Sequence, residues 1–175
     1  IRDRFILTGS TSVDDKNIMH TGTGRIARMK MYPMSLYESG ESNGQISLRA
    51  LFQDALLDID GVSSQLSIEQ LIFAACRGGC PATLRRKNPE AQLLTARDYI
   101  SNICESDIST VDGVQRNPTW TGLILRSYAG NISTLAKKSN ILKDVTANAG
   151  SMTMPSLDSY LNALEKLFVI EDVEA

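Results

Sequence analysis

Six apolar side chains near the C-terminal end of the chain constrain its fold more than any other feature. They recur three or four residues apart, which is the spacing of one face of an α-helix: Leu157, Tyr160, Leu161, Leu164, Leu167 and Phe168. A helix with one apolar face is stable only when other elements cover that face. Because aromatic residues make up 6% of the 175 residues, the covering core must be mostly aliphatic. The pattern predicts a helix over Pro155–Phe168 inside a helix-rich domain.

Three shorter helices are expected upstream of this one, over Thr119–Ala129, Ser133–Lys138 and Asn140–Ala149. Gly150 follows the third and is expected to cap it, because glycine tolerates the left-handed conformation at a helix end. The apolar run Val169–Val173 predicts a strand after the last helix. An order of helices followed by a strand is typical of a winged helix, a variant of the helix-turn-helix.

The middle of the chain predicts three more helices. Ser47–Leu57 carries apolar residues at amphipathic helical spacing. A second helix is expected over Ser67–Cys76, where Gln70 stands three residues after Ser67 as in a capping box. The Gly78-Gly79 pair ends that helix, and a third is expected from Pro89 to about Cys104.

Two strands are expected before these helices. Phe5-Ile6-Leu7 is a short apolar run that leads into small polar residues. Arg25–Tyr32 alternates apolar and basic side chains, with Ala27, Met29 and Met31 on one face, as a half-buried strand does. A buried strand so close to the first residue needs neighbours on both sides, so we interpret the chain as an internal fragment of a longer protein.

Charge and cysteine content narrow the functional classes. The net charge is −2 and the pI is about 5.4, so no global positive field attracts nucleic acid. Residues 131–175 carry four lysines against six acidic residues, which favours a protein-contact module over a DNA-binding one. Three cysteines at scattered positions form no disulfide framework and indicate a reducing, cytoplasmic environment. The longest apolar run, Leu71–Cys76, is far shorter than a membrane span.

Three motifs have weaker interpretations. Residues 22–27, Gly-Thr-Gly-Arg-Ile-Ala, match a dinucleotide fingerprint, but the segment after the glycines alternates as a strand where that fingerprint needs a helix. Cys76 and Cys80 have no third or fourth ligand nearby, so a zinc site is not expected and the metal prediction is none. His20 is the only histidine, and no nucleophile motif accompanies it.

Several segments together resemble one known family. The first group is Phe5-Ile6-Leu7-Thr8-Gly9-Ser10, a loop ending in Gly24-Arg25-Ile26, and Tyr32-Pro33-Met34-Ser35-Leu36-Tyr37-Glu38. The second group is Gly78-Gly79-Cys80-Pro81, where the family usually has an aromatic residue in place of Cys80, then Tyr128-Ala129 and Leu157–Val173. In this collinear order the chain resembles prokaryotic AAA-type P-loop ATPases with a C-terminal winged helix in an uncharacterised region.

The resemblance implies roles for three residues. Thr8 and Ser10 match sensor-like positions, whose polar groups lie near the γ-phosphate and orient the attacking water. Arg25 matches an arginine-finger-like position that stabilises charge on the transferred phosphoryl group. The alternative for Arg25 is a surface salt bridge at the start of a strand.

The resemblance also implies a fold and its limits. The fold class is α/β and helix-rich: trailing strands of a P-loop NTPase parallel sheet in residues 1–58, a helical linker or lid in 59–112, and a winged helix in 113–175. No G-x-x-x-x-G-K-[ST] motif and no strand ending in an acidic pair occur in the sequence. ATP and Mg²⁺ are therefore expected cofactors of the intact ATPase, and the fragment itself is expected not to hydrolyse ATP. Expected partners are nucleotide in the intact protein and a second copy paired through exposed strand edges, with no membrane. The alternatives are a winged-helix DNA-binding or regulatory module, and a scaffold for protein contacts.

Overall fold

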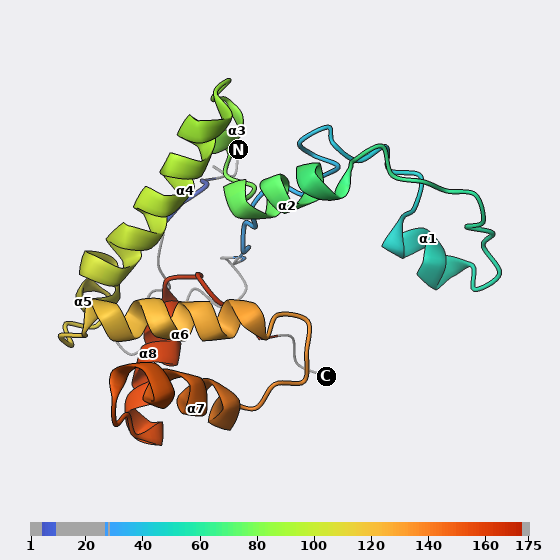
Figure 1. The fold of residues 1–175 in the computed structure, drawn as a ribbon. Helices are drawn as coiled ribbons and strands as arrows, with labels where there is room; N and C mark the ends of the chain where they lie inside the picture. Colours follow the sequence, from blue (N-terminus) through green and yellow to red (C-terminus); the bar gives the residue numbers. More distant parts are fainter. Residues whose placement is uncertain (1–4, 10–26, 28, 173–175) are drawn as a thin grey trace. The chain divides into compact units, whose positions relative to one another are not determined.

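A computed structural model describes residues 5–9, 27 and 29–172 (Figure 1). Two compact units divide the chain: Ala27–Tyr99, here called the middle unit, and Ile100–Ala175 grouped with Ile1–Ile26. The described residues from 100 to 172 are here called the C-terminal unit. Each unit is described by itself.

The middle unit contains three short helices and most of a longer one: α1 (Leu48–Gln53), α2 (Ile68–Arg77), α3 (Pro81–Leu84) and α4 (Pro89–Asn102). Helix α2 begins with the predicted capping box, because the Ser67 and Gln70 side chains each accept the other residue's backbone N–H. It ends at Gly78, whose φ of 73° lies in the left-handed region that favours glycine. The predicted cap and stop of this helix are confirmed.

The C-terminal unit is a bundle of helices: η2 (Ile103–Asp107), α5 (Ile108–Thr110), α6 (Pro118–Gly130), α7 (Lys138–Ala149) and α8 (Met154–Lys166). Helices α6 and α7 lie side by side, and α8 packs against α5 and α7 (Figure 1). The π-helix η2 follows α4 without a loop and α5 follows η2; the first residue of each, Ile103 and Ile108, lies in the core, 1% and 0% exposed. The core is mostly aliphatic, as the composition predicts.

The apolar stripe that predicted the last helix supplies much of this core. Leu157, Tyr160, Leu161 and Leu164 are all buried on α8. They pack with side chains from the neighbouring helices: Ile103, Ile108, Ile124, Ile141 and Val145. Burying one such aliphatic side chain contributes about 1.5–3 kcal/mol. Packing of α8 against its neighbours therefore holds the C-terminal unit together.

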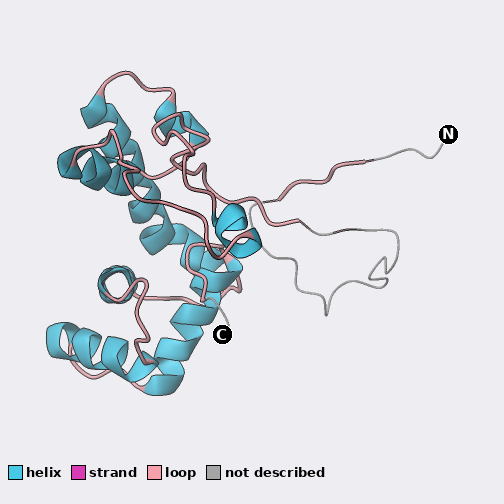
Figure 2. Ribbon diagram, turned by 90° about the vertical axis from the view of Figure 1, so that its right-hand side faces the viewer, coloured by secondary structure: helices cyan, strands magenta, loops and turns pink. Residues whose placement is uncertain are grey.

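The predicted α/β fold with strands of a P-loop parallel sheet is wrong. Figure 2 contains helices and loops but no strand within the described ranges. Phe5, Ile6 and Leu7 lie in extended chain and are 82–91% exposed, and Met29 and Met31 are equally exposed. The physical reason is that a strand satisfies its backbone only by pairing with a neighbour, and the described chain offers these segments none.

The strand expected after α8 is also absent. The prediction of a winged helix, which requires that strand, is therefore wrong. The described part, residues 169–172, forms no strand, and Val173 lies outside the described residues. The short helix expected over Ser133–Lys138 is absent as well: residues 133–137 form no helix, and Lys138 is the first residue of α7. Ser133 has φ 59°, which a right-handed helix excludes. The expected domain boundaries after residues 58 and 112 stay predictions.

Candidate functional site

The structure describes one of the three residues for which the resemblance implies a catalytic role. Thr8 lies in extended, exposed chain. Ser10 and Arg25 lie outside the described residues. The roles of all three residues therefore stay predictions.

Two other segments of the resemblance meet in the middle unit. The backbone N–H of Met34, in the Tyr32–Glu38 segment, donates to the carbonyl oxygen of Gly79 at 2.9 Å. A Cβ atom added at Gly79 would lie 2.2 Å from the Met34 carbonyl oxygen. That distance is too short for any side chain, so the contact requires glycine. The position of Gly79 after α2 does not by itself require glycine. The close contact with Met34 does.

An ion pair between Arg77 and Glu41 lies near this contact in the sequence, since Glu41 follows Met34 and Arg77 precedes Gly79. Arg77 Nη2 donates to Glu41 Oε2 at 2.7 Å, and the Ser39 hydroxyl donates to the same oxygen at 2.7 Å. These two hydrogen bonds, the one from Arg77 first, hold the pKa of Glu41 below its ordinary value. Arg77 is 9% exposed and its guanidinium lies 5.9 Å from the centre of the Phe73 ring. The charge of Arg77 is therefore buried and paired, which marks a structural role.

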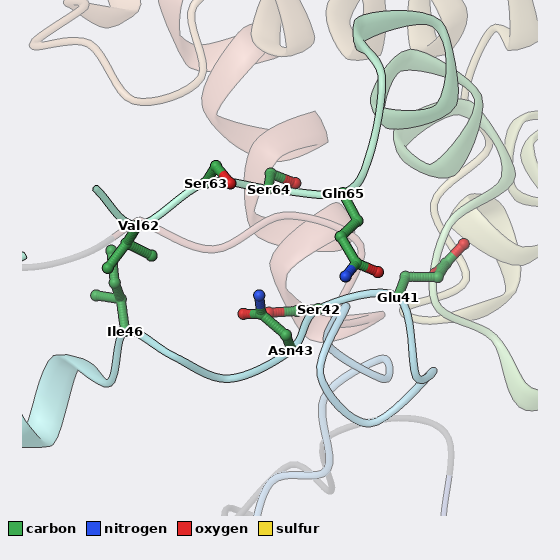
Figure 3. A pocket seen from close by; sticks show the side chains of 8 residues that line it. All are labelled: Glu41, Ser42, Asn43, Ile46, Val62, Ser63, Ser64 and Gln65. Carbon is green, nitrogen blue, oxygen red and sulfur yellow. The ribbon is translucent and has the colours of Figure 1, made fainter. Parts of the chain in front are cut away.

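A polar hollow of about 200 Å³ lies next to Glu41 (Figure 3). Its walls are Glu41, Ser42, Asn43 and Ile46 on one side and Val62, Ser63, Ser64 and Gln65 on the other. The side chains of Ile46 and Val62 approach each other at one end, whereas the Glu41 carboxylate points away toward Arg77. The Ser42, Asn43 and Ser64 oxygens each accept a backbone N–H two residues ahead. These polar groups stabilise local turns. No charged side chain among the lining residues points into the hollow to bind a ligand.

The C-terminal unit has its own buried cation, Arg116. Its guanidinium donates to both oxygens of Asp112 at 2.7 Å and to the carbonyl of Ile108 at 2.7 Å. It also donates to the carbonyl and the hydroxyl of Ser159 on α8, and lies 5.7 Å from the centre of the Tyr160 ring. The hydrogen bonds from Arg116 hold the pKa of Asp112 below its ordinary value of 3.8. Arg116 therefore ties the segment before α6 to α8.

The segment after α8 is tied to α6 in a similar way. The Tyr128 hydroxyl donates to Asp172 Oδ1 at 2.5 Å and to the Glu171 carbonyl at 3.2 Å. Burial and the hydrogen bond to Asp172 raise the pKa of Tyr128 to about 12. The phenol stays protonated at neutral pH and keeps donating this hydrogen bond.

Helices α7 and α8 are joined by a short turn of residues 150–153, in which Gly150 has φ 83°. The turn ends at Thr153, whose hydroxyl accepts the N–H of Ser156 as the N-cap of α8. On the outer side of α8, Asp158 forms an ion pair with Lys138 at 2.9 Å. The exposed charges of α8 are then Glu165 and Lys166, which is a poor set for phosphate contacts.

A second, larger hollow of about 610 Å³ opens between α6 and α7. Its lining residues are Leu123, Arg126, Ser127, Gly130, Asn131, Asp144, Ala147 and Asn148. The Ser127 hydroxyl donates to Asp144 Oδ2 at 2.7 Å. The hollow is thus mostly polar and carries one cation and one carboxylate.

The three cysteines have different surroundings. Cys76 and Cys80 are exposed, and Cys104 is buried. Hydrogen bonds from backbone N–H groups, that of Ala82 first, lower the pKa of the Cys80 thiol, whereas burial raises the pKa of Cys104. Within the described ranges no group of three or more His, Cys, Asp or Glu side chains is placed to hold a metal ion.

The buried ion pairs were not predicted from the sequence. Arg116 and Asp112 stand four residues apart, a spacing at which opposite charges meet on a helix, and this was the one signal available. Arg77 and Glu41 are 36 residues apart, and no local pattern links them.

Comparisons with known proteins give one match. Residues 68–175 match a protein family described as Domain of unknown function (DUF8612). No curated protein and no solved structure matches the chain significantly. None of the described helices is long and apolar enough to cross a membrane.

Proposed function

The chain belongs to the family described as Domain of unknown function (DUF8612). On the basis of the sequence resemblance, we propose that it forms part of an AAA-type ATPase. In this proposal Thr8 and Ser10 are sensor-like residues of the intact protein, and Arg25 is its arginine-finger-like residue. The proposal rests on the order of the matching segments along the sequence. The contact of Met34 with Gly79 joins two of these segments and explains why one of them needs glycine.

ATP and Mg²⁺ do not fit the residues present in this chain. A triphosphate needs a cradle of backbone N–H groups with a lysine, and the sequence has no glycine-rich lysine loop. Thr8 lies in exposed chain and not in the wall of a pocket. The proposal therefore assigns nucleotide binding to the intact protein and none to this chain alone.

The C-terminal unit serves in this proposal as a protein-contact module. The alternative is a DNA reader, but the charges of α8 do not suit one. Asp158 is paired with Lys138, and Glu165 stands beside Lys166 on the exposed side. The three free cysteines support a cytoplasmic location as part of the same proposal.

The experiment is phosphate release by the intact protein carrying Ser10→Ala, with Ser12→Ala as the matched control. Loss of a polar group that orients the attacking water should lower turnover by about 100-fold. Ser12 lies outside the matched positions, so its variant should keep the parent rate. Equal rates for both variants would contradict the role of Ser10. A gel shift with duplex DNA should show no salt-dependent complex, and a strong shift would contradict the contact role.

A further inference from the structure

We infer that the hollow between α6 and α7 is a contact surface for a second copy of this chain. The inference rests on the proposed role of the C-terminal unit as a contact module, and it names the partner. The hollow of about 610 Å³ lies in the volume range of binding sites, but it is open and polar, as an interface between proteins is.

Three polar side chains on its walls, Ser127, Asn131 and Asn148, already donate hydrogen bonds within the chain. The Ser127 hydroxyl donates to Asp144, the Asn131 amide to the Ser127 carbonyl at 2.8 Å, and the Asn148 amide to the Asp144 carbonyl at 2.7 Å. The second carboxylate oxygen of Asp144 is left to accept a further donor. A partner group that meets Asp144 must therefore be a donor, and a cation is the strongest one.

The hollow also contains a cation that its own carboxylate does not pair. Arg126 is exposed and forms no ion pair with another described residue, and Asp144 on the facing helix is likewise outside any ion pair described for the chain. One guanidinium and one carboxylate, neither in an ion pair with another described residue, thus lie on the neighbouring helices α6 and α7.

This arrangement is complementary to itself under a two-fold rotation. In a symmetric dimer each surface patch meets its own copy, so that residue i contacts residue j and j contacts i. Arg126 of one copy would meet Asp144 of the other, and the second Arg126–Asp144 pair would follow by symmetry. Two such pairs fix the register, and a single acidic or basic peptide would satisfy only one of the two charges.

The walls of the hollow permit a close approach. Gly130 and Ala147 are exposed and small, and a Cβ added at Gly130 would meet nothing within 4 Å. The loop that starts at the lining residue Asn131 leaves Ile132 64% exposed and Leu135 fully exposed. Exposed aliphatic side chains in this loop add apolar area of the kind that a protein interface uses.

The test is sedimentation equilibrium of the full 175-residue chain over a concentration series, with Arg126→Asp, Asp144→Arg and the double exchange. Each single variant places like charges opposite each other and should weaken association by roughly tenfold or more. The double exchange restores opposite charges and should recover affinity to within about threefold of the parent chain.

Ala147→Leu provides a second variant that does not change charge. Residue 147 is exposed, so leucine there fills the hollow without disturbing the core, and thermal denaturation checks that the variant is folded. It should abolish association while leaving the melting temperature unchanged. A parent chain that stays monomeric, or single exchanges that associate as the parent does, would overturn the inference. The test uses no nucleotide, so its failure leaves the ATPase proposal standing.

Discussion

Arg116 holds Asp112 by two parallel hydrogen bonds of 2.7 Å, one to each carboxylate oxygen. The Arg116 side chain is 2% exposed and the Asp112 side chain 25% exposed, so water screens the pair little on the arginine side. A two-pronged contact of this kind is the strong form of a charge-assisted hydrogen bond.

Asp112→Asn should therefore lower the free energy of unfolding by roughly 2 kcal/mol at neutral pH, because it leaves a buried guanidinium without its counter-charge. The pKa of Asp112 is lowered in the folded state, so this stabilisation is complete above the ordinary value of 3.8 and disappears as pH falls through the lower folded value. Urea denaturation at a series of acidic pH values checks it. The difference between parent and variant should shrink as pH falls, and a constant difference would contradict the assignment.

The Gly79 contact gives a steric prediction. Gly79→Ala would place a Cβ atom 2.2 Å from the Met34 carbonyl oxygen, and backbone atoms do not move away easily. The variant should lose about 2 kcal/mol of stability or release the Met34 amide to exchange with solvent. Amide hydrogen exchange at Met34 measures the second outcome directly.

Gly122→Ala is the matched control for that variant. Gly122 lies inside α6, and a Cβ added there meets nothing within 4 Å. Alanine should stabilise this helix by about 0.5–1 kcal/mol. Unchanged Met34 exchange and stability in Gly79→Ala would show that the two segments do not depend on each other.

Phe168 predicts a stabilising substitution at the end of α8. It has φ 57°, and the N–H groups of Phe168 and Val169 donate to the carbonyls of Glu165 and Leu164, as in a Schellman motif. Glycine usually occupies this position because a Cβ is strained there. Phe168→Gly should be more stable than Phe168→Ala by about 1 kcal/mol, since both lose the ring and only alanine keeps the strain. Thermal unfolding of the two variants measures the difference, and the reverse order would rule the strain out.

Local signals in the sequence predicted the ends of helices correctly. The expected strands failed because a strand forms only when another strand pairs with it. The Ser67 cap, Gly78 and Gly150 were found because each acts on the residues beside it. Helix α1 stops at Gln53 although apolar spacing continued to Leu57, because the Asp54 carboxylate accepts the N–H of Leu56 and forms a turn. Phe5–Leu7 has the composition of a strand, but composition cannot supply the neighbour that a strand requires.

The buried charges show the same limit. Arg116 contacts Ser159, which lies 43 residues further along the chain, and only the packing of α8 brings them together. Composition predicted the aliphatic core, because few aromatic residues are available to fill it. The contacts of Arg116 with α8, and of Arg77 with Glu41, depend on packing that no spacing in the sequence encodes.

Cysteine reactivity should follow the surroundings of each thiol. The lowered pKa of Cys80 leaves more thiolate at neutral pH, and burial both raises the pKa of Cys104 and hides it. Iodoacetamide followed by peptide mass spectrometry should find Cys80 modified first and Cys104 last. In the denatured chain the three rates should converge. Equal rates for Cys80 and Cys104 in the folded protein would contradict the described surroundings.

Phosphate release by the intact protein carrying Arg25→Ala tests the proposed ATPase function most directly, with Arg28→Ala as the neighbouring control. An arginine that stabilises the transferred phosphoryl group contributes on the order of 1,000-fold to turnover, so Arg25→Ala should reduce phosphate release to near background. Arg28→Ala should keep the parent rate. Parent-like turnover in Arg25→Ala, or an intact protein that releases no phosphate from ATP, would contradict the account.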